Sequence, residues 1–100
     1  VSKFHSLIIS KRHVQNYFDL TNDELLACHD LLSKIKNKII SDDNVVNGFN
    51  IGANSGKTAG QSILHCHIHL IPRRKGDVKN PQGGVRGVIP SKQHYVRKTK

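Results

Sequence analysis

The chain has 100 residues, with 16 Lys/Arg against 7 Asp/Glu and 36% hydrophobic residues. A chain of this length forms one domain at most and buries only roughly 60 to 65% of its unfolded surface. Two isolated cysteines, Cys28 and Cys66, exclude a disulfide framework and fit a reducing compartment. Residues 1–14 lack a signal-peptide pattern, and no apolar run reaches membrane-span length. We therefore expect a soluble, cytoplasmic protein without membrane contact.

The positive charge is concentrated near the end of the chain. Residues 1–72 carry seven Lys/Arg and six Asp/Glu, whereas residues 73–100 carry nine and one. This distribution predicts a nearly neutral domain over residues 1–90 and a basic tail over residues 91–100. Such a tail either binds phosphates or nucleic acid or is ordinary solvated surface. The sequence contains no methionine, so we expect that Val1 is not a natural start.

The first half of the chain is typical of a strand followed by a helix. FHSLIIS, residues 4–10, is a β-rich run that ends at the charged turn KRH. Thr21 and Glu24 form a capping box, which predicts a helix over residues 22–40. The apolar side chains at helical spacing are Leu25, Cys28, Leu31, Leu32, Ile35 and Ile39. The predicted helix is therefore amphipathic.

The second half supplies two further strands. VVNGFNIGA, residues 45–53, is strand-like, although Gly48 and Gly52 weaken it. NSGKTAGQ, residues 54–61, is a short loop, so the strands on either side of it should pair antiparallel. From Arg73 onward the apolar period is lost, and we expect mostly irregular structure. The predicted fold class is α+β, an antiparallel sheet with one long helix packed on its aliphatic face.

QSILHCHIHLIP, residues 61–72, places histidines at alternate positions of an aliphatic run. Because a strand turns successive side chains to opposite faces, His65, His67 and His69 should share one face. The other face should carry the apolar side chains of Leu64, Cys66, Ile68 and Leu70. The run therefore has a chemical face and a core face.

The residues alone leave three uses of the chemical face open. A purely structural role is the weakest, because packing preference does not explain strict alternation of histidines. Imidazoles at alternate positions can converge on zinc, but residues 54–72 contain no Asp or Glu to complete a ligand set. A neutral imidazole can instead attack phosphorus if an acceptor holds the proton on its other nitrogen. The flanking histidines and the preceding loop would then offer donors to the phosphate oxygens.

GFNIGANSGKTAGQSILHCHIHLIPR closely resembles the signature of the histidine triad (HIT) family, in which three histidines alternate with apolar residues. FHSLIISKRHVQNYFDLTNDE resembles the opening of the family, and PRRKGDVKNPQGGVRGVIP resembles the branch that includes dinucleoside polyphosphate hydrolases. The resemblance covers roughly residues 1–90. It implies a nucleotide hydrolase or nucleotidyltransferase that acts on the α-phosphate of a nucleotide anhydride, ester or phosphoramidate.

The resemblance also implies roles for the three histidines. His67 matches the nucleophile, which forms a covalent nucleotidyl intermediate. His69 matches the residue that contacts the phosphate and leaving-group oxygens, and His65 matches the residue that supports the site. The implied chemistry requires no metal or other cofactor. Some family members carry a structural zinc with a Cys pair, but no CxxC supports one here.

Further residues match family positions outside the triad. Asn54, Gln61 and Ser62 match loop positions that approach the phosphates of the substrate. Asn54 could equally be a turn residue, and Gln61 and Ser62 could serve only to pin the loop. His5 and His13 match upstream histidines and form a candidate additional site, although each could be an ordinary polar residue at a strand end.

Family members usually carry further sequence before the point where this chain starts, so we expect an N-terminally incomplete domain. An uncovered sheet edge is a liability, and together with the resemblance it leads us to expect a homodimer. The leading hypothesis is hydrolysis of a substrate such as a diadenosine polyphosphate through His67. The alternative is a catalytically weak nucleotide- or nucleic-acid-binding module that uses the same phosphate site and the basic tail. A metal-dependent hydrolase is a third hypothesis.

Overall fold

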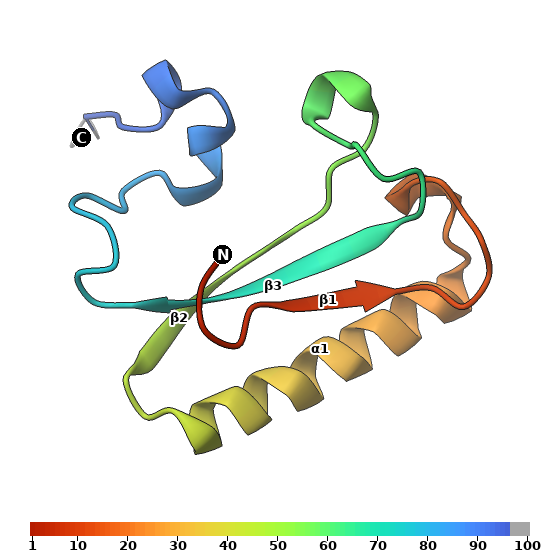
Figure 1. Cartoon of the computed structure of the whole chain (residues 1–100), viewed down its shortest axis with the longest axis horizontal. Coiled ribbons are helices and arrows are strands. Elements are labelled where there is room, and N and C mark those ends of the chain that lie inside the picture. Colours follow the sequence, from red (N-terminus) through yellow and green to blue (C-terminus); the bar gives the residue numbers. More distant parts are fainter. Residues whose placement is uncertain (97–100) are drawn as a thin grey trace, which may run out of the picture.

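Three strands and one long helix form the framework of the chain. The computed structural model describes residues 1–96, and the last four residues of the predicted basic tail lie outside the described part. Strands β1 (Ser6–Ile9), β2 (Val46–Gly52) and β3 (His67–Arg74) form one sheet in the order β1-β3-β2, with both pairs antiparallel. Helix α1 (Asn22–Asp42) lies along one face of the sheet (Figure 1). The predicted α+β fold is confirmed.

Helix α1 begins where the capping box predicts. Thr21 Oγ1 accepts a hydrogen bond from the Glu24 amide at 3.1 Å, and Glu24 Oε1 accepts one from the Thr21 amide at 2.8 Å. These bonds satisfy donors that would otherwise be unpaired at a helix N-terminus. The helix continues to Asp42, slightly beyond the expected end, and the Asp43 amide closes it by donating to the Ile39 carbonyl.

The core lies between α1 and the inner face of the sheet. Its centre is a cluster of buried and half-buried apolar residues: Ile39, Val46, Leu70, Leu32, Ile35 and Phe49. The three helical members belong to the apolar stripe that the sequence predicts. Because this cluster packs against only one face of β3, the other face can carry polar side chains.

The central strand β3 has the two faces that the alternation predicts. Ile68 and Leu70 are buried on the side of α1, and Leu70 is only 1% exposed. His67 and His69 are half-buried and lie on the opposite face. The chemical face and the core face are therefore both present in β3.

The strand assignment from the sequence is wrong at both ends of β3. Leu64 does not lie on the core face: it is 59% exposed, because the residues before Cys66 form a loop and the alternation starts only there. At the other end, Arg73 and Arg74 belong to the strand rather than to irregular structure. They are held there by pairing with β2, in which Val46 lies opposite Arg74.

Two segments flank the histidine face. Residues 53–66 connect β2 to β3 and contain a 3-10 turn at Lys57–Ala59. After β3 the chain forms two further 3-10 helices, Gly84–Val88 and Pro90–Lys92, within otherwise irregular structure. Figure 1 shows both segments on the side of the sheet away from α1, the loop at one end and the C-terminal segment at the other. Among residues 1–96, no helix has the length and apolar character needed to cross a membrane.

Candidate active site

His67, the first residue of β3, is held in one tautomer by the backbone. Its Nδ1 lies 2.9 Å from the carbonyl oxygen of His65. A carbonyl oxygen can only accept a hydrogen bond, so Nδ1 carries the proton. In the neutral ring Nε2 then keeps its lone pair, which is the form that a nucleophilic imidazole needs.

His65 is fixed by the segment that follows β1. Its Nε2 lies 3.0 Å from the Ser10 carbonyl oxygen and 3.4 Å from Ser10 Oγ. Because that carbonyl only accepts, the proton of the neutral His65 ring is on Nε2. The ring of His13 lies edge-on to the His65 ring, with the centroids 5.0 Å apart. The carbonyl group that orients His67 is therefore itself anchored to the chain around Ser10.

His69 forms a hydrogen-bonded pair with His5, which lies just before β1. Their facing nitrogens, His69 Nδ1 and His5 Nε2, are 2.9 Å apart, and the two rings are stacked. Burial lowers the pKa of both rings, and the neighbouring His67 ring lowers the pKa of His69 further. Two largely neutral rings share one proton between these nitrogens. The rings of His67 and His69 lie edge to face with centroids 5.1 Å apart.

The conformation of the loop before β3 is held by the side chain of Gln61, which is 5% exposed. Its Oε1 accepts a hydrogen bond from the Gly56 amide at 2.9 Å. Its Nε2 donates to the carbonyl oxygens of Gln15 and Ile63. The side-chain amide of Gln61 therefore bonds to backbone groups of the protein. This corresponds to the loop-pinning role that the sequence left open.

The other two loop residues differ from Gln61. Asn54 and Ser62 are exposed. Their polar groups are therefore accessible to solvent. Asn54 lies beside Gly60, where a Cβ would be 3.9 Å from Asn54 Nδ2.

Ser10 is a neighbour of the histidine cluster that the sequence did not indicate. Its contact with His65 depends on β1 lying directly beside β3, with Ile9 opposite His67. The same arrangement brings the Cys66 amide to 2.8 Å from the Val14 carbonyl oxygen. A serine after a strand has no distinguishing sequence signal, so only knowledge of the strand register could have identified it.

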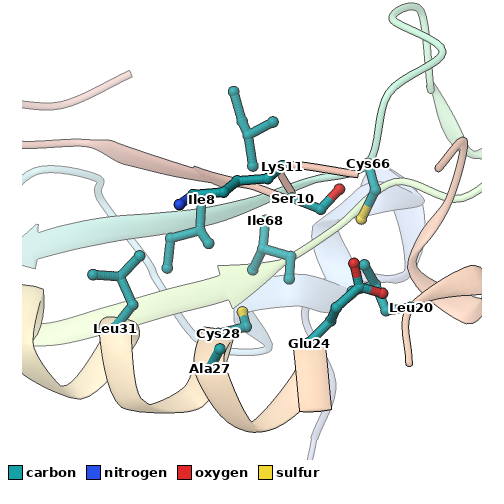
Figure 2. Close-up of a pocket in the computed structure, with 11 residues that line it drawn as sticks. Ile8, Ser10, Lys11, Leu20, Glu24, Ala27, Cys28, Leu31, Cys66 and Ile68 are labelled. Atoms are coloured by element: carbon teal, nitrogen blue, oxygen red, sulfur yellow. The ribbon is translucent and has the colours of Figure 1, made fainter. Parts of the chain in front are cut away.

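The two cysteines lie behind β3 rather than in the histidine cluster. Cys28 and Cys66 line a cavity of about 330 Å³ between the sheet and α1, together with Ile68 and Leu31 (Figure 2). Burial raises the pKa of both thiols, so they stay protonated and are poor nucleophiles at neutral pH. Cys66 points into the core as the sequence predicts.

Comparison with known proteins identifies the family. The sequence model of one protein family, described as the HIT domain, matches residues 1–76. The chain belongs to the HIT family. Within residues 1–96 of this HIT chain, no group of three or more His, Cys, Asp or Glu side chains is arranged to hold a metal ion.

Several curated relatives resemble the HIT chain. An uncharacterised HIT-like protein of Methanocaldococcus jannaschii is 34% identical over 76% of this chain and 57% of its own length. An asymmetrical bis(5'-nucleosyl)-tetraphosphatase of Schizosaccharomyces pombe is 37% identical over 73% of this chain and 40% of its own. A bis(5'-adenosyl)-triphosphatase of Dictyostelium discoideum is 35% identical over 76% and 50%. The chain thus spans about half the length of these relatives.

Solved structures of the family share the fold. A hypothetical histidine triad nucleotide-binding protein of Sulfolobus tokodaii superposes with a TM-score of 0.70 and 34% identity, covering 77% of this chain and 51% of its own. A zinc-bound histidine triad family protein of Mycobacterium smegmatis gives a TM-score of 0.68 and 30% identity, covering 76% and 55%. The sheet and helix described above are therefore those of the HIT family.

Proposed function

We propose that this HIT chain hydrolyses or transfers the nucleotidyl group of nucleotide anhydrides, esters or phosphoramidates, with dinucleoside polyphosphates as the leading substrates. The observation that carries the proposal is the bond from His67 Nδ1 to the His65 carbonyl oxygen, which leaves Nε2 as a lone-pair nitrogen. The activities for which the two polyphosphatase relatives are named support the same substrate class.

In the first step, the lone pair of His67 Nε2 forms a bond to the α-phosphorus. The bond from phosphorus to the leaving atom breaks, and its electron pair departs with the leaving group. The His67 ring becomes cationic, so the hydrogen bond from Nδ1 to the His65 carbonyl strengthens as the charge develops. The carbonyl therefore stabilises the covalent nucleotidyl-His67 intermediate.

In the second step, a water oxygen attacks the same phosphorus. The bond to His67 Nε2 breaks and returns its electron pair to the ring, and one proton passes to solvent. The products are a nucleoside monophosphate and neutral His67. Dividing the reaction into two displacements is the general advantage of a covalent intermediate.

His69 is the group that we place against the leaving atom. If His5 Nε2 donates to His69 Nδ1, the proton of His69 is on Nε2 and can donate a hydrogen bond to that atom. The lowered pKa of His69 keeps the ring neutral near pH 7, so His69 supplies a dipole rather than a full charge. We assign the exposed Asn54 and Ser62 to the other phosphate oxygens, with Gln61 holding their loop.

Mass spectrometry of the intact protein tests the covalent step. Wild type and His67→Ala are each exposed briefly to diadenosine tetraphosphate or an adenylyl phosphoramidate and are quenched without acid, because imidazole–phosphorus bonds are acid-labile. An adenylyl adduct is expected on wild type alone, with AMP released on longer incubation. Turnover should fall by roughly three orders of magnitude or more in His67→Ala.

His29→Ala is the matched control, because His29 is an exposed histidine of α1 and not part of the cluster. It should form the adduct as wild type does. Unchanged turnover in His67→Ala would overturn the proposal. If neither protein forms an adduct or AMP while calorimetry still detects nucleotide, the chain is the binding module that the sequence left as the alternative. Loss of turnover in EDTA would instead favour the metal-dependent hydrolase.

We also propose that the chain acts as a homodimer. β1 and β2 are the outer strands of the sheet, and each has one strand neighbour within residues 1–96. Their outer edges present backbone groups that a second copy could pair with. Sedimentation should detect a dimer at micromolar concentration, and a stable monomer there would contradict this part of the proposal.

A further inference from the structure

A second cavity lies on the histidine face, at the opposite end of β3 from His67. It has a volume of about 660 Å³ and is bounded by Val1 and Ser2, by Asn50 of β2, by Ile71 and Arg73 of β3, and by the segment that follows β3. We name that segment, residues 77–95, the arm, and the cavity the arm pocket. We propose that the arm pocket binds the leaving nucleoside polyphosphate of a dinucleoside polyphosphate substrate. This inference rests on the function proposed above.

The arm pocket continues the surface that carries the histidines. His67, His69, Ile71 and Arg73 follow one another at alternate positions of β3, so their side chains share one face. Asn50 lies on the same face because it is the register partner of Ile71. From His69 to Arg73 the strand advances roughly 13 Å. A substrate attacked at His67 can therefore extend past His69 into the pocket without leaving the sheet.

Contacts within the arm form the wall of the pocket in the absence of a ligand. Arg86 donates from Nε to the carbonyl oxygens of Lys92 and Gln93, which joins the two short helices of the arm. The ring of His94 is 2.9 Å from the Asn80 carbonyl oxygen, so its Nε2 donates there. Gly83 packs so tightly against Gln93 that an added Cβ would lie 1.9 Å from the Gln93 carbonyl oxygen. These contacts give the arm a defined shape.

The lining combines apolar side chains with one ion pair and the positive charge of Lys79. Val78 and Val85 are 46% and 62% exposed although both line the pocket, so they offer an apolar surface to a base. Arg73 is neutralised by Asp77, whose carboxylate it binds through Nε and Nη2 at 2.7 and 2.9 Å. Lys79 adds a positive charge that this ion pair does not cancel. The volume lies within the usual range of small-molecule sites.

The proposed mechanism indicates that the leaving half of the substrate, rather than the transferred half, reaches the arm pocket. The proposed role of His69 is to donate to the leaving atom, and His69 lies between His67 and the arm pocket on the strand. The group beyond that atom is then directed toward the pocket. For a dinucleoside tetraphosphate this group is a nucleoside triphosphate, whereas for an adenylyl phosphoramidate it is only ammonia.

Nuclear magnetic resonance tests binding directly, with ATP as the probe and His67→Ala protein to prevent turnover. ATP should shift the amide signals of Val78, Lys79 and Val85, whereas AMP at the same concentration should not. Val85→Glu places a carboxylate in the pocket and should abolish these shifts by repelling the phosphates. Val88→Glu is the matched control, because Val88 belongs to the same short helix, is 79% exposed and does not line the pocket.

Kinetics supply the second readout, in variants that retain His67. The ratio of kcat/KM for diadenosine tetraphosphate to that for adenylyl phosphoramidate should fall about tenfold in Val85→Glu and stay at the wild-type value in Val88→Glu. Unmoved amides in the presence of ATP, or equal behaviour of the two variants, would overturn the proposal. If wild type hydrolyses neither substrate, the proposed function fails, while the ATP shifts still decide whether the pocket binds a nucleoside triphosphate.

Discussion

His5 and His69 share one hydrogen bond between Nε2 and Nδ1, 2.9 Å long, although 64 residues separate them in the chain. The bond joins a residue before β1 to the second histidine of β3. It requires the register in which Leu7 lies opposite His69. The protonation states of the two rings are therefore coupled, because only one of the two facing nitrogens can donate in this bond.

Removing the partner of His69 should lower the rate without removing the proposed nucleophile, His67. His5→Phe keeps a ring that can stack on His69 but loses the nitrogen that holds its Nδ1. We expect kcat to fall about 10- to 100-fold, because His69 is no longer held as a donor toward the leaving atom. His5→Gln keeps a side-chain amide near the same place and should retain more activity. Wild-type kcat in His5→Phe would show that this bond has no role in the reaction.

The same pair predicts how stability depends on pH. The pKa values of His5 and His69 are lowered from 6.5 by burial, so below 6.5 the unfolded chain binds more protons than the folded chain. The free energy of unfolding should therefore decrease as pH falls from 6.5 through the lowered values, and these groups should have no effect well above 6.5. Urea titrations between roughly pH 5 and pH 7.5 measure this slope.

His69→Asn should flatten that slope, because one of the two titrating rings is gone. His29→Asn is the control, since His29 is an exposed residue of α1 and its loss should leave the slope as it is. An equal slope in wild type and His69→Asn would contradict the linkage.

The buried side chain of Gln61 should contribute measurably to the free energy of unfolding, although it lies in a loop. Gln61→Leu would leave the Gly56 amide and the Gln15 and Ile63 carbonyls without their partner in a buried setting. The loss should be about 2 to 3 kcal/mol in the free energy of unfolding. Gln15→Leu is the control, because Gln15 is exposed and contributes only its carbonyl to this contact. Equal stability of the two variants would mean that the buried amide does not hold the loop.

Alanine substitutions at two glycines should distinguish the cost of backbone strain from the cost of a steric clash. Gly76 and Gly83 both have a positive φ, at 85° and 87°, but a Cβ at Gly76 would meet no atom within 4 Å. Gly76→Ala should cost about 1 to 2 kcal/mol, the usual penalty of a left-handed conformation. Gly83→Ala adds a collision with the Gln93 carbonyl oxygen, so it should also displace the arm. Amide hydrogen exchange in residues 82–93 should be faster in Gly83→Ala than in Gly76→Ala.

The sequence predicts those parts of the fold that depend on local periodicity. The capping box at Thr21 and Glu24 correctly marks the start of α1, because a helix N-terminus is determined by the few residues around it. Alternation correctly places Cys66 in the core and His67 and His69 on the other face. These features need no knowledge of distant parts of the chain.

The sequence fails where a loop or a distant strand decides the outcome. Leu64 fits the apolar alternation but is exposed, because the chain enters β3 only after the bends that precede Cys66. The contacts of Ser10 with His65 depend on β1 lying beside β3, which no local pattern reveals. The buried position of the Gln61 side chain likewise depends on the carbonyl of Gln15, 46 residues earlier.

The pairing of Ile9 with His67 and of Leu7 with His69 has a consequence for how preparations of this protein behave. A slip of β3 by one residue would turn its histidines toward α1 and bring Ile68 to the outer face. Such a molecule would keep much of its secondary structure yet lack the proposed nucleophile on its outer face. Titration of the adenylated fraction would therefore count correctly assembled molecules, and circular dichroism would overlook the others.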